Sequence, residues 1–321
     1  MLDFSTGVSP LAPPPEILAA VREADVRRYP HPTAAPLCAR LAALHDVAPS
    51  QIVAGAGSVE LIWALARAYA GPGRHAVVFA PSFGEYAQAL SVSGARVVEV
   101  RAGSPPFLPA LDAALAALAS APSLAFLCRP SNPGLGSLPP AALEALARAA
   151  PSTLFVVDEA YLPMFEGVEA ISPRPNVAIL RSLTKVFALP GLRLGYLVAD
   201  AEVARVVQAA LPPWNVSAPA SAAGIAACGL GDRVVAVRRE IARLRGQLAD
   251  RLKSPLVTLD AQGGPFLLYR VGDAAALERT LSARGLRVRN GTSFGLPAHL
   301  RIGVRPDDEQ ATLAAAWHEA L

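Results

Sequence analysis

Apolar runs of strand length alternate with helix-like stretches through the middle of the chain. The strand-like runs are predicted at residues 75–80, 97–100, 124–128, 154–157, 177–180 and 194–198. The helix-like stretches lie between them or before them, at residues 37–45, 59–70, 84–93, 111–119 and 141–149. Continuous apolar strands separated by helices are typical of a mostly parallel sheet with helices on both faces. This pattern predicts an α/β fold.

The pattern changes from about Trp214 onward. A long helical stretch at 218–253 is followed by predicted strands at 256–259, 266–270, 287–288 and 300–304 and by helices at 274–284 and 307–321. This mixture indicates a smaller α+β domain. The N-terminal arm is rich in proline and is expected to be extended apart from one helix at 16–23. We therefore predict a large domain at 30–215 and a small domain formed by 1–29 and 216–321.

Composition narrows the class of protein. The chain has 321 residues and a net charge of +3, and 53% of its residues are hydrophobic. The small charge and the scattered arginines argue against nucleic-acid binding. No apolar run reaches the ~18 residues that cross a bilayer, and the N-terminus lacks the basic and apolar regions of a secretion signal. We therefore expect a cytoplasmic protein without a membrane partner.

Cysteine and histidine offer no metal site. The three cysteines are an odd number without CxxC spacing, which argues against a disulfide framework and against zinc. The five histidines show no ligand spacing either. We expect buried thiols and no bound metal.

Two lysines stand in a chain whose other basic side chains are almost all arginine. Lys253 ends an arginine-rich helical stretch, where a cation is favourable without any function. Lys185 instead follows a predicted buried strand. A lysine amine can lose its proton and form a Schiff base, whereas an arginine guanidinium cannot. Taken alone, a lysine at such a position is more often structural, so its surroundings decide.

Two neighbouring features point to a cofactor. Asp158 closes a predicted apolar strand, at the sheet edge where open α/β sheets bind ligands. It could cap a turn, or it could pair with a protonated pyridine nitrogen. The segment Gly55-Ala56-Gly57-Ser58 precedes a predicted helix, so its backbone N–H groups could hold a phosphate. The third glycine of a dinucleotide fingerprint is missing, which makes a nicotinamide site the weaker reading.

A family resemblance joins these features. Residues 182–196, SLTKVFALPGLRLGY, resemble the lysine motif of the class I and II aminotransferases, which use pyridoxal phosphate (PLP). Six further motifs follow the family's order: Tyr29-Pro30, Gly57-Ser58, PSFG at 81–84, SNP at 131–133, VDEAY at 157–161 and LRI at 300–302. The likeness covers nearly the whole chain. It is greatest to the subgroup of histidinol-phosphate aminotransferase and of the threonine-phosphate decarboxylase of cobalamin synthesis, and it implies an aspartate-aminotransferase-like fold (fold type I).

The resemblance implies a role for each matching residue around the ring of PLP. Lys185 would carry the cofactor as a Schiff base and move the substrate's Cα proton. Asp158 would pair with the pyridine nitrogen, Asn132 and Tyr161 would bond to the phenolic oxygen, and Phe83 would stack on the ring. Phe83 could equally be ordinary core.

The same resemblance implies a phosphate site and a substrate site. The phosphate would be held by Ser182, Arg193, the backbone of Gly57 and Ser58, the N–H of Val59, and Tyr29 of a second subunit. Val59 stands where many relatives have aspartate, but only its backbone is needed. Tyr29 in this role implies a homodimer. Arg301 would clamp a substrate carboxylate, a task that suits a bidentate guanidinium, and Arg289 would be the second substrate-facing arginine.

Three functions remain open at this level. An aminotransferase would move an amino group from a small amino acid, with or without a phosphate, to a 2-oxo acid. A threonine-phosphate decarboxylase would use the same site and release CO₂. A non-catalytic binding module would keep only the fold. We predict the aminotransferase, because transamination is the commoner activity of the superfamily.

Overall fold

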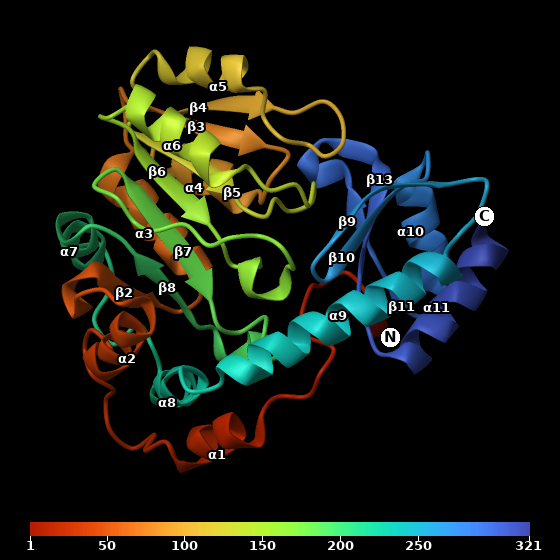
Figure 1. Cartoon of the computed structure of the whole chain (residues 1–321), viewed down its shortest axis with the longest axis horizontal. Coiled ribbons are helices and arrows are strands. Elements are labelled where there is room, and N and C mark those ends of the chain that lie inside the picture. Colours follow the sequence, from red (N-terminus) through yellow and green to blue (C-terminus); the bar gives the residue numbers. More distant parts are fainter.

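A seven-stranded sheet forms the larger part of the molecule (Figure 1), and the computed structural model describes all residues, 1–321. Its strand order is β2-β8-β7-β6-β5-β3-β4. The strands are β2 (Ile52–Gly55), β3 (His75–Ala80), β4 (Arg96–Arg101), β5 (Leu124–Cys128), β6 (Leu154–Asp158), β7 (Val177–Ser182) and β8 (Gly195–Val198). Only β8 runs antiparallel to both of its neighbours. The predicted α/β class with a mostly parallel sheet is confirmed.

Helices cover both faces of this sheet. One face packs on α3 (Ser58–Tyr69), α4 (Glu85–Val92) and α7 (Ala201–Ala209), and the other on α2 (Ala35–His45), α5 (Leu111–Leu118), α6 (Pro140–Ala149) and α8 (Ala218–Ala227). Successive strand residues face opposite sides: Phe126 and Val156 lie in the core under α3, whereas Leu127 and Val157 lie in the core under α6. Burial on both faces explains why these strands are continuous apolar runs.

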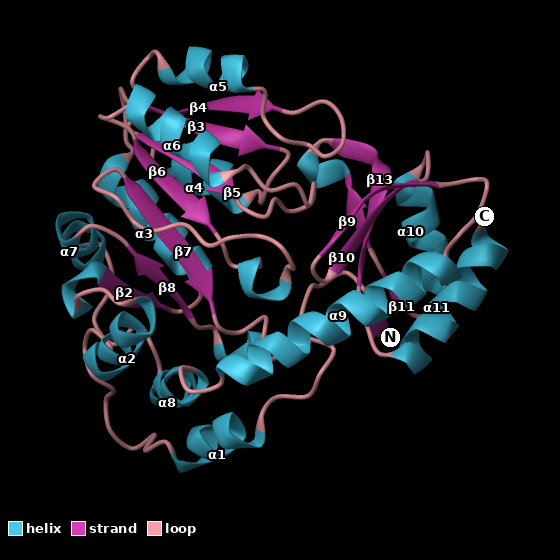
Figure 2. Ribbon diagram, in the orientation of Figure 1, coloured by secondary structure: helices cyan, strands magenta, loops and turns pink.

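A second, antiparallel sheet lies beside the first (Figure 2). Its order is β12-β13-β10-β9, with β9 (Thr258–Gly263), β10 (Phe266–Arg270), β12 (Arg289–Gly291) and β13 (Leu296–Gly303). The helices α10 (Ala274–Ala283) and α11 (Asp307–Ala320) pack on it. The N-terminal β1 (Leu2–Asp3) pairs with β11 (Leu286–Arg287), so the start of the chain packs against its C-terminal part. The domain boundary at 215/216 stays a prediction.

The single long helix predicted at 218–253 is wrong. The chain forms α8 and then α9 (Gly231–Arg251), which meet at 85°. Gly229 and Gly231 flank the bend, and glycine is a poor residue for a helix interior. The two halves also have different partners: α8 packs on α1 (Pro15–Glu23) and α2, while α9 crosses to the second sheet (Figure 1). No single helix is long and apolar enough to cross a membrane.

Some elements were not predicted or were displaced. The short strand β2 and the helix α7 were missed, and β9 lies at 258–263 rather than at 256–259. The residues of β9 are mostly half-buried, so the strand lacks the continuous apolar run that marks the others.

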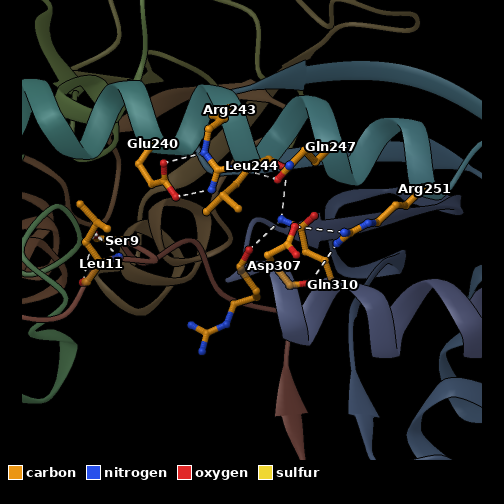
Figure 3. Close-up of polar contacts among 10 residues, drawn as sticks. Ser9, Leu11, Glu240, Arg243, Leu244, Gln247, Arg251, Asp307 and Gln310 are labelled. Carbon is orange, nitrogen blue, oxygen red and sulfur yellow. Dashed lines mark hydrogen bonds and ion pairs between the residues drawn. The ribbon is translucent and has the colours of Figure 1, made fainter.

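The far end of α9 is fixed to α11 by polar contacts, buried at Gln310 and exposed at Arg251 (Figure 3). The Gln310 side-chain amide donates to the carbonyl of Leu244 at 3.1 Å and to that of Arg305 at 2.7 Å. Arg251 donates to the carbonyl of Asp307 at 2.9 Å and pairs with its carboxylate at 3.0 Å. These contacts join the second sheet's last helix to the helix that reaches back to the first sheet.

Candidate active site

The site lies at the edge of the large sheet where its parallel strands end. Gly55, Gly195 and Ser182 stand in register across β2, β8 and β7, and Cys128 and Asp158 stand in register at the ends of β5 and β6. Loops and helix ends therefore converge there. An inner cavity of about 210 Å³ opens at this edge. Its lining includes Gly57, Ser58, Val59, Phe83, Asn132, Asp158, Tyr161, Ser182, Lys185 and Arg193, which are ten of the predicted residues.

An outer cavity of about 490 Å³ adjoins the inner one and shares Phe83, Asn132, Tyr161 and Lys185 with it. The outer cavity is bounded by the second sheet, from which Arg289 and Arg301 come, and by residues 5–8 of the N-terminal arm. The two cavities together form a space that is open to ligands between the two sheets.

Lys185 stands in the loop after β7 and points its amine into both cavities. Its Nζ lies 4.9 Å from the centroid of the Tyr161 ring, and its carbonyl accepts the N–H of Ser9 at 2.9 Å. Burial lowers the pKa of Lys185, while the charge of Asp158 opposes this effect. A lowered pKa increases the neutral, nucleophilic fraction of the amine at neutral pH.

Asp158 is buried at the end of β6, and both of its carboxylate oxygens are held. Oδ1 accepts the N–H of Ala160 at 2.9 Å, and Oδ2 accepts the hydroxyl of Tyr86 at 2.7 Å. Burial raises the pKa of Tyr86 well above its usual value, and the charge of Asp158 adds to this, so Tyr86 stays a donor. Tyr86 was not predicted as a site residue. It lies three positions after Phe83, and only the packing of α4 brings it to Asp158.

The N-terminus of α3 forms an anion-binding loop. Gly57 has φ +88° and no side chain caps the helix, so the first N–H groups of α3 face the cavity without a side-chain partner. The guanidinium of Arg193 packs on this loop: a Cβ added to Gly57 would lie 2.8 Å from its Nη2. The Ser182 hydroxyl lies 3.1 Å from that of Thr184, and both residues line the inner cavity.

Arg289 and Arg301 lie directly opposite each other on β12 and β13, so their side chains leave the sheet on the same face. Arg301 is buried, and it donates to the Asn132 side-chain oxygen and, at 2.6 Å, to the carbonyl of Ser5. Its Nε has no partner, and burial lowers its pKa to about 10. Arg289 is exposed and donates to the Ser293 hydroxyl at 2.7 Å. The pair can bind a ligand with two negative charges.

The opposite polarity of the two ends of the inner cavity fits PLP. A carboxylate stands at one end to face a protonated ring nitrogen, and helix N–H groups with Arg193 stand at the other to face a phosphate. Lys185, which also lines this cavity, follows β7, a strand that lies between β2 and β6 in the sheet. Burial raises the pKa of Cys128 to about 12, so this wall residue stays a thiol and is no nucleophile.

Tyr29 and Glu159, which both belong to the predicted motifs, lie apart from the cavities. Tyr29 is 83% exposed, and its ring stacks at a tilt on Trp214 with centroids 5.1 Å apart. It lines neither cavity of its own chain. Glu159, next to Asp158, points away and is buried between Arg129 at 2.7 Å and Arg181 at 2.6 Å. This ion cluster supports the strand ends and does not reach the site.

The comparisons with known proteins define the class. The family model for aminotransferase class I and II matches residues 1–316. The chain therefore belongs to the class I and II aminotransferases and is a PLP-dependent aminotransferase. The predicted fold type, cofactor and reaction type are confirmed.

Several individual relatives and solved structures resemble the chain over nearly its full length. Histidinol-phosphate aminotransferase of Symbiobacterium thermophilum is 38% identical, with 100% of this chain and 91% of the relative covered. That of Ruegeria sp. (strain TM1040) is 33% identical, with 98% and 89% covered. Among solved structures, histidinol-phosphate aminotransferase from Sinorhizobium meliloti in complex with pyridoxal-5'-phosphate has a TM-score of 0.90 and 27% identity, covering 99% of this chain and 90% of that one. L-threonine-O-3-phosphate decarboxylase from Porphyromonas gingivalis (TM-score 0.85, 24% identity, 99% of each chain) shows the fold alone.

Proposed function

We propose that this aminotransferase acts on histidinol phosphate, and that a 2-oxo acid accepts the amino group. The observation that carries this proposal is the pair of guanidiniums, Arg289 and Arg301, in register at the mouth of the cavity that contains Lys185. A phosphate monoester has two negative charges and three oxygens, which suit two arginines. The histidinol-phosphate aminotransferases that resemble the chain over its full length support the same substrate.

Each residue of the inner cavity then has a task. When bound, PLP supplies an electron-accepting ring that makes the substrate's Cα–H bond easier to break. Lys185 holds the cofactor and, once its amine is free, takes and returns the proton at that carbon. Asp158 keeps a positive charge on the ring nitrogen favourable. Asn132 and Tyr161 would hydrogen-bond to the phenolic oxygen of the ring, and Phe83 would pack on the ring.

The remaining residues bind the two anionic groups. The N-terminus of α3 at Gly57 and Ser58, with the N–H of Val59, receives the cofactor phosphate together with Ser182 and Arg193. Arg301, oriented by Asn132 and by the Ser5 carbonyl, takes the substrate's anionic group. Arg289 lies at the rim and provides the second charge.

We further infer a homodimer in which Tyr29 reaches the phosphate of the neighbouring subunit. Tyr29 is exposed and stacked on Trp214, with Val26 also exposed beside it in the same surface hollow. Such an aromatic patch is typical of an interface. The three free cysteines support a reducing, cytoplasmic location.

The test is an assay of the purified enzyme with PLP. Histidinol phosphate with 2-oxoglutarate should give glutamate. Histidinol phosphate alone, or glutamate alone, should shift the visible absorption band of the cofactor. Borohydride treatment should attach the cofactor to Lys185, detected by mass spectrometry of the peptide, and a Lys185→Arg variant should show neither attachment nor turnover. CO₂ release from threonine phosphate, without glutamate from histidinol phosphate, would replace the proposal with the decarboxylase.

A further inference from the structure

The last residue of the edge strand β4, Arg101, reaches across from the large sheet to the second sheet. Its Nη1 donates to the carbonyl of Phe294 at 2.8 Å. Phe294 belongs to η4 (Thr292–Phe294), the turn between β12 and β13. The following Gly295 has φ +75°, and a Cβ there would lie 2.5 Å from Arg101 Nη1. The guanidinium therefore fits closely against a turn that favours glycine.

The same turn positions both substrate-facing arginines. Ser293 accepts a hydrogen bond from Arg289 at 2.7 Å. The Phe294 ring lies under both cations, with its centroid 5.2 Å from the guanidinium carbon of Arg289 and 5.8 Å from that of Arg301. A shift of this turn would therefore move the Ser293 hydroxyl and the Phe294 ring away from both guanidiniums.

Arg101 does not touch either cavity directly. It lines neither of them, and its Nη2 is paired with Glu99 at 2.5 Å, which orients the guanidinium toward the turn. Its one hydrogen bond to the second sheet is to the carbonyl of Phe294.

We propose that Arg101 is a specificity-determining positioning residue, which fixes the Phe294 turn to the large sheet and thereby sets Arg289 and Arg301 for a dianionic substrate. This inference rests on the proposed function, since it needs those two arginines to bind the substrate. It adds a residue of the large sheet, outside both cavities, to the determinants of substrate affinity.

The first experiment compares Arg101→Met with Arg96→Met, a matched control at the other end of β4 whose exposed side chain has no polar partner. Arg101→Met should raise the KM for histidinol phosphate about 5- to 10-fold, which is the net value of an ordinary hydrogen bond, because the lost contact acts on the substrate only through the turn. The kcat and the affinity for PLP should stay within about twofold, since the inner cavity is untouched. Arg101→Lys should recover most of the loss, and Arg96→Met should behave as the native enzyme.

A second variant attacks the same contact from the other side. Gly295→Ala should displace the guanidinium and raise the same KM, and the double variant should be no worse than the worse single one, because both remove one interaction. Additive effects, or an unchanged KM in Arg101→Met, would overturn the proposal.

Two further measurements test the positioning role of Arg101 independently of the identity of the substrate. The Gly295 amide donates to the Thr292 carbonyl in the native turn, and its hydrogen exchange should be faster in Arg101→Met. Calorimetry should show that this variant also binds inorganic phosphate more weakly. If the native enzyme ignores histidinol phosphate but these two changes appear, the substrate is wrong and the positioning role stands. Faster exchange with unchanged phosphate binding and KM reduces Arg101 to a structural contact.

Discussion

The hydrogen bonds to Asp158 hold the carboxylate in place for a cofactor, and each can be tested alone. The Tyr86 hydroxyl occupies Oδ2 at 2.7 Å, and the Tyr86 ring stacks on Phe126 with a centroid separation of 5.0 Å. Tyr86→Phe should keep the stacking and remove only the hydrogen bond. Loss of a bond to a buried charge costs about 1.5–3 kcal/mol. We expect PLP to bind about 10- to 100-fold more weakly, measured by titrating the apoenzyme and following the absorption band.

The control is Tyr69→Phe, since Tyr69 ends α3, is half-buried and donates to no side chain. It should bind PLP as the native enzyme does. Equal affinity in the Tyr86 and Tyr69 variants would mean that Ala160 alone holds Asp158.

The buried imidazole of His45 makes the stability of the protein depend on pH. Burial, with the charge of Arg181, lowers its pKa from 6.5 to about 4. Between these values the unfolded chain binds a proton that the folded chain does not. The free energy of unfolding should therefore fall as the pH drops from about 6.5 to about 4, by about 1–2 kcal/mol after allowance for partial exposure.

Urea unfolding of His45→Gln at several pH values measures this effect. The variant should lack that part of the acid dependence, whereas the same change at exposed His31 should leave it in place. An identical pH profile in the native protein and the His45 variant would place the acid sensitivity in other groups.

At the scale of elements, the approach of β8 to the start of α3 forms the phosphate loop. A Cβ at Gly195 would lie 2.4 Å from the Ser58 nitrogen and 3.0 Å from the Arg181 carbonyl, and neither backbone can yield freely. Gly195→Ala should cost about 1–3 kcal/mol of stability and weaken PLP binding, measured by thermal unfolding and cofactor titration.

Gly246→Ala is the matched change, because Gly246 lies inside α9 with nothing within 4 Å of the added carbon. It should stabilise the protein by about 0.5–1 kcal/mol. A Gly195 variant as stable as this one would mean that the two elements can move apart.

The elements also show where sequence patterns succeed. Strands β3, β5, β6 and β7 were predicted because each is buried on both faces and reads as an unbroken apolar run. The four residues of β2 were missed, since so short a run carries little periodicity. The bend between α8 and α9 was missed because both halves are helical by composition, and only their different partners separate them.

At the scale of the molecule, the proposed dimer predicts sites shared between subunits. Tyr29→Ala and Lys185→Ala should each be nearly inactive. A mixture that has exchanged subunits should recover about a quarter of the native activity, because half of the dimers are mixed and each has one complete site. Sedimentation should show a dimer for both variants. No recovery after exchange, with dimers present, would place Tyr29 outside the neighbouring site.

The sequence by itself determined the fold class, the cofactor and most residues of the inner cavity. The fold class followed from the pattern, because buried strands must be apolar. The cofactor and the site residues followed from the family resemblance, whose motifs stand next to strand ends or a helix start, where the local chain already fixes their place. Only the tertiary structure decided the partners that lie far apart in the chain: Tyr86 with Asp158, Arg301 with Asn132, and Arg101 with Phe294. Such contacts depend on how helices and sheets pack, and packing is decided by complementary shape across the whole core, which no local pattern records.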